Sequence, residues 1–233
     1  MLDSFFSFDP SHLLISLLGG IVPALLWLGF WLREDTLHPE PRRIIFWTFC
    51  AGAVAALVSL PLEAIAYSFT DVKIVLFLAV AVIEETAKYI AAKKAALGKA
   101  TYDEPVDALI YLITAALGFA ALENTLFIAS SLAGKGLVTA LIVGETRFVG
   151  STLLHILASS IIGVSLALPF FHNAKEKKRD FRIGLILAIL LHTLFNFSII
   201  QEGTHSLFLT FFSVWVLVVL LLLIFEKVKR IQS

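Results

Sequence analysis

Two adjacent glutamates and a lysine interrupt a long apolar stretch of the chain. Glu84, Glu85 and Lys88 lie in the run 72–92, which with roughly 20 residues is long enough to cross a bilayer. Each charged side chain near the middle of a membrane costs about 2.5–3.5 kcal/mol on insertion scales. Glu84 and Lys88 share a helix face and are able to pair, whereas Glu85 is rotated by about 100° and needs another partner. The three residues therefore either hold a helix bundle together as an ion-pair network or belong to a functional site.

Further polar side chains occur in three later apolar segments. For helices that cross the membrane at about 1.5 Å per residue, all of them fall at similar depths, in the middle or the outer half of the membrane. Arg147, Ser151 and His155 follow a four-residue step along one helix face, and so do His192 and Asn196. This agreement in depth and face indicates a functional site. The candidate catalytic residues are Glu84, Glu85, His155, His192 and Asn196, with Lys88, Glu123, Asn124 and Arg147 in supporting positions.

Glutamate, histidine and asparagine in a membrane cavity are suited to the hydrolysis of a peptide bond. A carboxylate shielded from bulk water can act as the general base on a water molecule. Histidine and asparagine can donate hydrogen bonds to the developing oxyanion, which is worth about 2.7–4 kcal/mol per donor. Two histidines and a glutamate also form the set that binds catalytic zinc. The cofactor therefore stays open: the glutamate route needs none, and the zinc route would draw its ligands from Glu85, Glu123, His155 and His192.

Composition and hydropathy predict the elements that position these residues. The 233 residues are 59% hydrophobic and 15% charged, whereas soluble domains have roughly 45–50% apolar and about 25% charged residues. We expect one integral membrane domain over 1–233, an all-α polytopic helix bundle with the motif-bearing core at about 72–202. The seven expected transmembrane helices are 13–32, 44–67, 72–92, 106–130, 149–171, 183–202 and 206–225, with one interfacial or re-entrant helix at 137–148.

The distribution of basic residues predicts the orientation of the chain. Lysine and arginine are concentrated in alternate loops and in the C-terminal tail, while the N-terminal arm has Asp3 and Asp9 and no basic residue. Because cytoplasmic loops carry an excess of lysine and arginine, we expect an extracytoplasmic N-terminus and a cytoplasmic C-terminus. The loops are short, so chemistry has to take place in or beside the membrane.

Three other charged residues have simpler structural interpretations. Asp107 begins an apolar segment, where a carboxylate stabilises a helix N-terminus. Arg147 lies beside Glu145 and is able to pair with it near the membrane surface. Glu63 follows Pro61 in the second apolar segment, and it is either a neighbour of the site or a helix-end residue.

The ordered motifs resemble those of the PrsW family of intramembrane proteases. Residues 84–88 match its E-E-x-x-K motif, and residues 107–124 match a segment that ends in G-F-A-x-x-E-N. Arg147 with His155, and His192-x-x-x-Asn196, complete the resemblance, which covers four successive helices. The family is distantly similar to the CAAX prenyl endopeptidases and the bacteriocin-processing enzymes.

This resemblance implies a protease of the bacterial plasma membrane that cleaves a single-pass membrane protein. In the best-known family role the substrate is an anti-sigma factor, cut on its extracytoplasmic side to start a stress response. By the same resemblance, the two glutamates activate water, the two histidines assist or bind metal, Asn196 stabilises the oxyanion, and Glu123 orients the site or joins the ligands.

Two other functions stay open, and the expected partners are the substrate protein and the lipid bilayer, without nucleic acid. One is a proton- or ion-coupled transporter, because buried Glu and His relays also mark ion pathways. Against it, the sequence has no evident inverted repeat of the kind that many transporters have. The other is a non-catalytic relative that keeps the fold as a sensor or scaffold.

Overall fold

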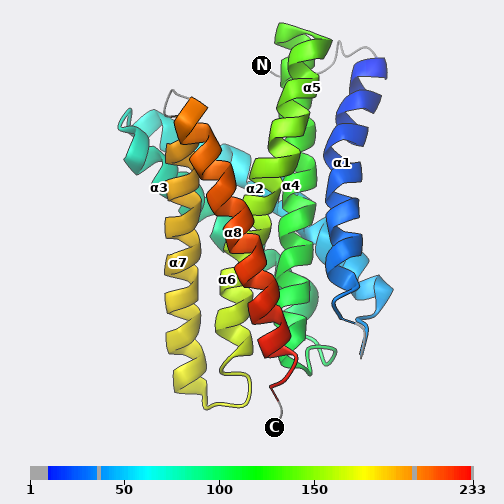
Figure 1. Ribbon diagram of the computed structural model, residues 1–233, viewed down its shortest axis with the longest axis vertical. Coiled ribbons are helices and arrows are strands. Elements are labelled where there is room, and N and C mark those ends of the chain that lie inside the picture. The colour runs from blue at the N-terminus through cyan, green and yellow to red at the C-terminus, as the bar shows by residue number, and fades with distance from the viewer. Residues whose placement is uncertain (1–9, 36–37, 201–203, 232–233) are drawn as a thin grey trace.

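The computed structural model describes residues 10–35, 38–200 and 204–231, and the regular structure of these residues is entirely helical (Figure 1). Asp3, Asp9 and residues 201–202 of the sixth expected span lie outside the described residues. The helices are α1 (Pro10–Leu32), α2 (Arg42–Phe69), α3 (Lys73–Ala92), the π-helix η1 (Lys93–Leu97), α4 (Pro105–Lys135), α5 (Leu137–Thr146), the π-helix η2 (Arg147–Ser151), α6 (Thr152–Ala167), α7 (Ala174–Ile200) and α8 (Thr204–Val228).

Six helices in the described part of the chain are long and apolar enough to cross a membrane, which confirms the polytopic helical bundle. They are α1, α2, α4, the continuous helix Leu137–Ala167, α7 and α8. The third expected span, α3, has 20 residues but is too charged to be among the six. Its Glu84, Glu85 and Lys88 are buried inside the bundle. The chain therefore keeps these charges away from lipid by packing the charged face of α3 against other helices, while Val75, Leu78 and Val82 on its other face are exposed.

The segment 137–148 differs from the expectation of a separate interfacial or re-entrant helix. It forms the first part of one continuous helix, in which α5 passes through η2 into α6. In the sequence, the polar residues Glu145 and Arg147 indicated the end of a helix. Arg147 does not end the helix, because its guanidinium finds partners on α4. Figure 1 shows α5 beside the last turns of α4 at the upper end of the molecule.

Helix α4 is the centre of the bundle and is buried along most of its length. It packs against α1, α2 and α6. At the crossing with α2 the two backbones touch: a Cβ atom on Gly52 would lie 1.9 Å from the carbonyl oxygen of Ala115, and one on Gly118 would lie 1.9 Å from that of Phe49. These two glycines, one on each helix, therefore allow an interhelical distance that a side chain at either position would prevent.

The start of α4 confirms the structural interpretation of Asp107. Pro105 occupies the first turn, and Glu104 and Asp107 form a capping box. The backbone N–H of Glu104 donates to Oδ2 of Asp107 at 2.7 Å. This cap satisfies backbone donors that the first turn leaves without an intrahelical partner. Asp107 therefore fixes the end of the central helix.

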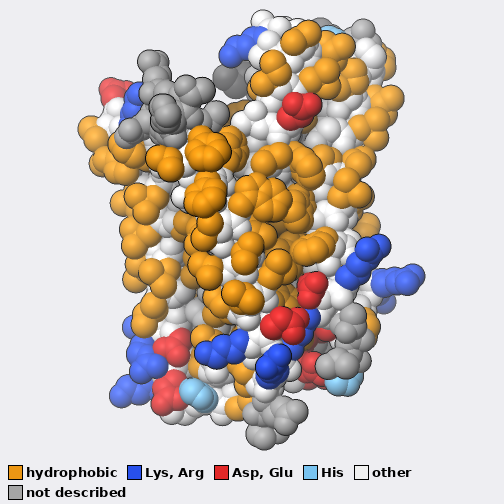
Figure 2. All heavy atoms as spheres, in the orientation of Figure 1, with side chains coloured by type: hydrophobic (Ala, Val, Ile, Leu, Met, Phe, Trp, Pro, Cys, Tyr) orange, Lys and Arg blue, Asp and Glu red, His pale blue; other side chains and the backbone are white. Residues whose placement is uncertain are grey.

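The outer surface is apolar around the middle of the molecule. On the face in Figure 2, hydrophobic side chains cover α7 and α8, and charged side chains gather mainly at the lower end. Exposed leucine, isoleucine, valine and phenylalanine side chains account for much of this band. In water such a surface would be unfavourable, but it matches the hydrocarbon of a bilayer. The fold thus presents apolar side chains to lipid and keeps polar ones inside.

Candidate active site

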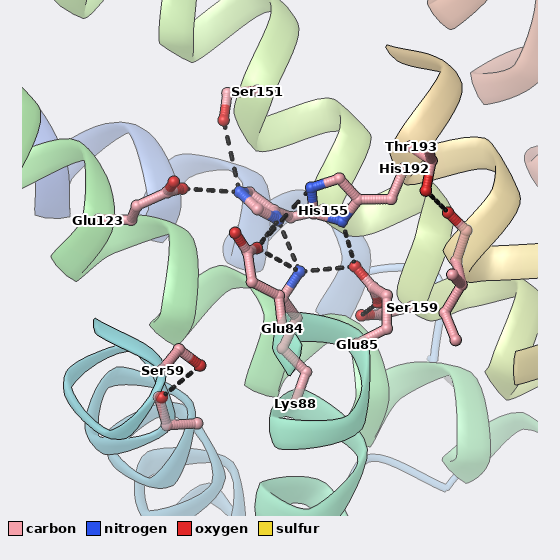
Figure 3. A network of polar contacts seen from close by, with 12 residues as sticks. Ser59, Glu84, Glu85, Lys88, Glu123, Ser151, His155, Ser159, His192 and Thr193 are labelled. Carbon is pink, nitrogen blue, oxygen red and sulfur yellow. Dashed lines mark hydrogen bonds and ion pairs between the residues drawn. The ribbon is translucent and has the colours of Figure 1, made fainter. Parts of the chain in front are cut away.

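Helices α3, α4, α6 and α7 bring predicted polar residues, among them Glu84, His155 and His192, into one network of contacts (Figure 3), and this network borders a cavity. The cavity has a volume of about 490 Å³ and also contacts η2 and α2. Glu85 and Lys88 lie directly behind Glu84 and do not line it, and Asn124 supports the wall. The predicted site residues that line the cavity are Glu84, Glu123, Arg147, His155, His192 and Asn196.

Lys88 is the buried hub of the site. Its Nζ donates to Oε1 of Glu85 at 2.7 Å and to Nδ1 of His155 at 2.7 Å, and it lies 3.4 Å from Oε2 of Glu84. The ammonium also lies 4.6 Å from the centre of the Phe119 ring. The sequence predicted Glu84 as its partner from the four-residue spacing. The three-residue spacing to Glu85 gives the shorter contact, because Glu85 points into the same interior space as the ammonium.

Glu85 is completely buried and uses both carboxylate oxygens in hydrogen bonds. Besides Lys88, its Oε1 accepts from Nδ1 of His192 at 2.7 Å. Its Oε2 accepts from Oγ of Ser159 at 3.3 Å. Glu85 therefore links α3 to both α6 and α7, and its position fixes the ring of His192.

Glu84 has a different environment although it is the neighbouring residue. It is 3% exposed, and its Oε2 has no hydrogen-bond partner among the described residues. This oxygen lies 3.8 Å from Nδ1 of His155 and 3.8 Å from Nε2 of His192. Buried acceptors without a partner are rare in proteins and usually mark a bound water, an ion or a functional role. Glu84 therefore lines the cavity, and its buried Oε2 lies between two imidazoles and the Lys88 ammonium without accepting a hydrogen bond.

Glu123 and Arg147 form the rim of the cavity together with His155. Nε2 of His155 donates to Oε2 of Glu123 at 2.8 Å, and Nη2 of Arg147 contacts the same oxygen at 2.6 Å. Nε of Arg147 donates to Oδ1 of Asn124 at 2.6 Å. The partners of Arg147 are thus on α4, and not at Glu145 as the sequence interpretation allowed. The guanidinium neutralises a cavity carboxylate and joins two helices.

The π-helix η2 positions this guanidinium. Nη2 of Arg147 also donates to Oγ of Ser151 at 3.0 Å, four residues further along the chain. Nδ2 of Asn124 donates to Oγ1 of Thr152 at 2.9 Å, so a second contact ties α4 to the end of η2. Short π-helical segments are rare and occur often at functional sites. Here the segment turns Arg147 and Ser151 toward the same cavity as His155.

Asn196 lies one turn beyond His192 on α7 and lines the cavity. It is half-buried, and it has no hydrogen bond to another described side chain. Its amide is therefore available to a substrate. The sequence analysis placed Asn196 and His192 on one face, and both residues do face the cavity.

Phe119 and Thr152 are parts of the site that the sequence reasoning missed. Phe119 packs against Lys88, and its ring centre lies 5.5 Å from that of His155. The signal for Phe119 was present, because it precedes Glu123 by four residues and shares its helix face. Thr152 gave no such signal, since its role depends on Asn124 of another helix.

Glu84, His155 and His192 also form a group that could hold a metal ion. One ligand atom of each residue lies within 4.8 Å of the others. The ring nitrogens that face away from Glu84 are held by carboxylates, Nδ1 of His192 by Glu85 and Nε2 of His155 by Glu123. Carboxylates in this position orient histidine ligands in many zinc sites, so these residues fit a zinc ion. The sequence analysis named Glu85 and Glu123 as candidate ligands, whereas the structure places both behind the histidines.

The fold and the site together define a multi-pass membrane protein with a carboxylate–histidine site inside its helix bundle. The chain belongs to the PrsW family: the family model described as "PrsW family intramembrane metalloprotease" matches residues 40–224. Among curated proteins it is similar to Protease PrsW of Clostridioides difficile (strain 630), with 28% identity over 197 residues that cover 81% of each chain. It is also similar to Protease PrsW of Bacillus subtilis (strain 168), with 26% identity over 229 residues that cover 92% of this chain and 94% of the relative. No solved structure matches the chain.

Proposed function

We propose that this chain is an endopeptidase in which Glu84 activates a water molecule inside the membrane. The observation that carries the proposal is Oε2 of Glu84, a buried acceptor without a hydrogen bond that lies 3.8 Å from His155 and from His192, in a residue that lines the cavity. Glu85 is fully engaged by Lys88 and His192, so we assign it an anchoring role. On this proposal Glu84, and not Glu85, is the base.

The hydrogen-bond network sets the roles of the two histidines. Lys88 donates to Nδ1 of His155, which leaves the proton of this imidazole on Nε2, toward Glu123. His192 donates from Nδ1 to Glu85, so its Nε2 carries a lone pair that faces Glu84. One water molecule is then able to donate one hydrogen to Glu84 and the other to His192. Its own lone pairs point away from both acceptors and toward a substrate carbonyl.

The chemical step follows from this placement. Glu84 takes a proton from the water as the oxygen attacks the carbonyl carbon, and it later gives the proton to the leaving amine. The amide of Asn196 donates to the oxyanion, a contribution of about 2.7–4 kcal/mol per donor in measured cases. Lys88 stays positively charged behind the site and stabilises the ionised form of Glu84.

A metal route is the second candidate, and the carboxylate-held histidines favour it. Glu84, His155 and His192 would hold a zinc ion, which in such sites lowers the pKa of bound water and polarises a carbonyl. For this, Nδ1 of His155 has to exchange the Lys88 ammonium for the metal. Metal analysis of the purified protein separates the routes. We expect well under one zinc per chain, and one zinc per chain that is lost in His192→Ala would establish the metal route instead.

For the substrate, we propose a single-pass protein of the bacterial plasma membrane, of the anti-sigma-factor kind, cut near the extracytoplasmic side. This part rests on the family and on the expected orientation, with the N-terminus outside and the C-terminus in the cytoplasm. The lysines and arginines in the loops at the lower end of the bundle support that orientation.

The proposed chemistry is tested with protein reconstituted in liposomes together with a single-pass peptide, in water enriched in ¹⁸O. We expect the wild type to release two fragments with one ¹⁸O atom in the new carboxylate. Loss of the base in Glu84→Gln should lower the rate by about 10²–10⁴-fold. Exposed Glu145 on α5 provides the matched control, and Glu145→Gln should cleave like the wild type. Equal rates in Glu84→Gln and wild type would exclude Glu84 as the base.

A further inference from the structure

Glu63 is a cavity carboxylate to which the proposed chemistry gives no role. It lies on α2, and it lines the same cavity as Glu84 and Glu123. Its side chain is half-buried in a wall that also contains Leu60, Phe77 and other apolar side chains. Ionisable groups at membrane depth are costly, and they usually face a partner or a functional cavity.

The other carboxylates of the site have cationic partners. Lys88 pairs with Glu84 and Glu85, and Arg147 pairs with Glu123. Glu63 has no ion pair or hydrogen bond with another described residue. Among the described residues, four carboxylates at the site therefore face two cations, and Glu63 is the carboxylate without a cationic contact.

The position of Glu63 along α2 sets its depth relative to Glu84. Glu63 precedes the end of α2 at Phe69 by six residues, or about 9 Å, and Glu84 follows the start of α3 at Lys73 by eleven, or about 16 Å. Measured along the two helices, Glu63 is therefore about 7 Å closer than Glu84 to the short connection that joins the helix ends. An extended peptide covers about 3.4 Å per residue, so this difference corresponds to about two residues of a bound substrate.

We propose that Glu63 forms a binding subsite for a lysine or arginine side chain of the substrate, about two residues from the cleaved bond toward the α2–α3 connection. This inference rests on the proposed function and narrows its substrate class. A basic side chain supplies the missing positive charge in a cavity where water screens it weakly. Tyr67 lines the cavity one turn further along α2, and its ring is able to pack against the aliphatic stem or the charged group of such a side chain.

The test uses single-pass peptides with a leucine–alanine membrane segment, reconstituted in liposomes with the protein. One lysine is moved through successive positions of the flank, and each peptide has a twin with uncharged norleucine at that position. Binding is measured by fluorescence energy transfer in the Glu84→Gln background, so that it does not depend on cleavage. Cleavage is measured separately with Glu84 intact. Each measurement is repeated with Glu63→Gln and with Glu145→Gln, a control that removes an exposed carboxylate outside the cavity.

We expect one lysine position, about two residues from the cut, to bind about tenfold tighter than its norleucine twin. Glu63→Gln should remove this preference, raising KM for the lysine peptide with little change in kcat, and Glu145→Gln should keep it. Equal binding of lysine and norleucine at every position, or a preference that persists in Glu63→Gln, would overturn the subsite. Cleavage of no peptide by the protein with Glu84 intact would count against the proposed function alone, because binding still decides the subsite.

Discussion

Glu84 and Glu85 are neighbours in the sequence and differ in almost every physical respect. The rotation of about 100° per helical residue sends Glu85 toward α6 and α7, where Lys88, His192 and Ser159 saturate its oxygens. Glu84 lines the cavity, and its buried Oε2 accepts no hydrogen bond. A saturated carboxylate is a poor base but a good structural support. The two residues should therefore be separable by experiment.

Substitutions of Glu84 and Glu85 should differ in their effect on thermal stability. Glu85→Gln leaves the buried Lys88 ammonium without its nearest anion, and breaking a buried ion pair costs about 3–5 kcal/mol. In a chain of this size that corresponds to a decrease in Tm of about 10 °C. Glu84→Gln removes a charge that lies 3.4 Å from Lys88 and accepts no hydrogen bond there, so its Tm should stay close to that of the wild type. Thermal unfolding in detergent measures both, and equal decreases would contradict the assigned roles.

At this scale the sequence identified the members of the site more reliably than their partners. Spacing on a helix limits which side chains are within reach, and it correctly grouped His192 with Asn196. It selected Glu84 as the partner of Lys88, but the three-residue spacing also allows contact, and Glu85 makes the shorter one. The four-residue step of Arg147 correctly placed it beside Ser151, but its partners Glu123 and Asn124 are on α4, and no pattern within its own helix specifies them.

The crossing of α2 and α4 is the contact between elements that the site depends on most. Helix α4 carries Glu123 and Asn124, and α2 contributes Glu63 to the opposite wall of the cavity. The distance between the helices is set by Gly52 and Gly118, each of which faces a backbone carbonyl of the other helix. A change in this distance would alter the width of the cavity without touching a catalytic group.

Gly118→Ala tests this dependence. Its added methyl group would lie 1.9 Å from the carbonyl oxygen of Phe49, and overpacking of this kind typically costs about 1–3 kcal/mol. We expect a lower Tm and a lower cleavage rate, since the cavity wall moves with α2. Gly134→Ala is the control, because nothing lies within 4 Å of its added carbon. An unchanged Tm in Gly118→Ala would show that the helices do not need this close contact.

Helix positions were largely predictable from apolar runs, and the exception has a physical cause. The expected spans 44–67 and 106–130 lie within α2 and α4, which extend a few residues further at each end. The prediction of a separate helix at 137–148 was wrong. It was made because a charged residue near the end of an apolar run normally marks the membrane surface. Arg147 remains inside a continuous helix because α4 satisfies its charge, and that information is tertiary.

At the scale of the whole molecule, the polar and apolar parts are inverted relative to a soluble enzyme. The lipid-facing surface is apolar, and carboxylates, histidines, a lysine and an arginine surround an internal cavity (Figures 2 and 3). Such an interior provides water and charge at a depth where a membrane segment has neither. A transporter would need the same arrangement of polar residues inside and apolar residues outside. Detection of a cleavage product is therefore what distinguishes a protease from a transporter.

The most direct measurement compares the termini of membrane proteins in cells that express the wild type or Glu84→Gln at equal levels, with Glu145→Gln as the control. The account predicts new N- and C-termini near the end of a single-pass segment, present with the wild type and Glu145→Gln and absent with Glu84→Gln. Those termini would identify the substrate together with the cleaved bond. Identical termini in all three strains across several stress conditions would contradict a protease that depends on Glu84.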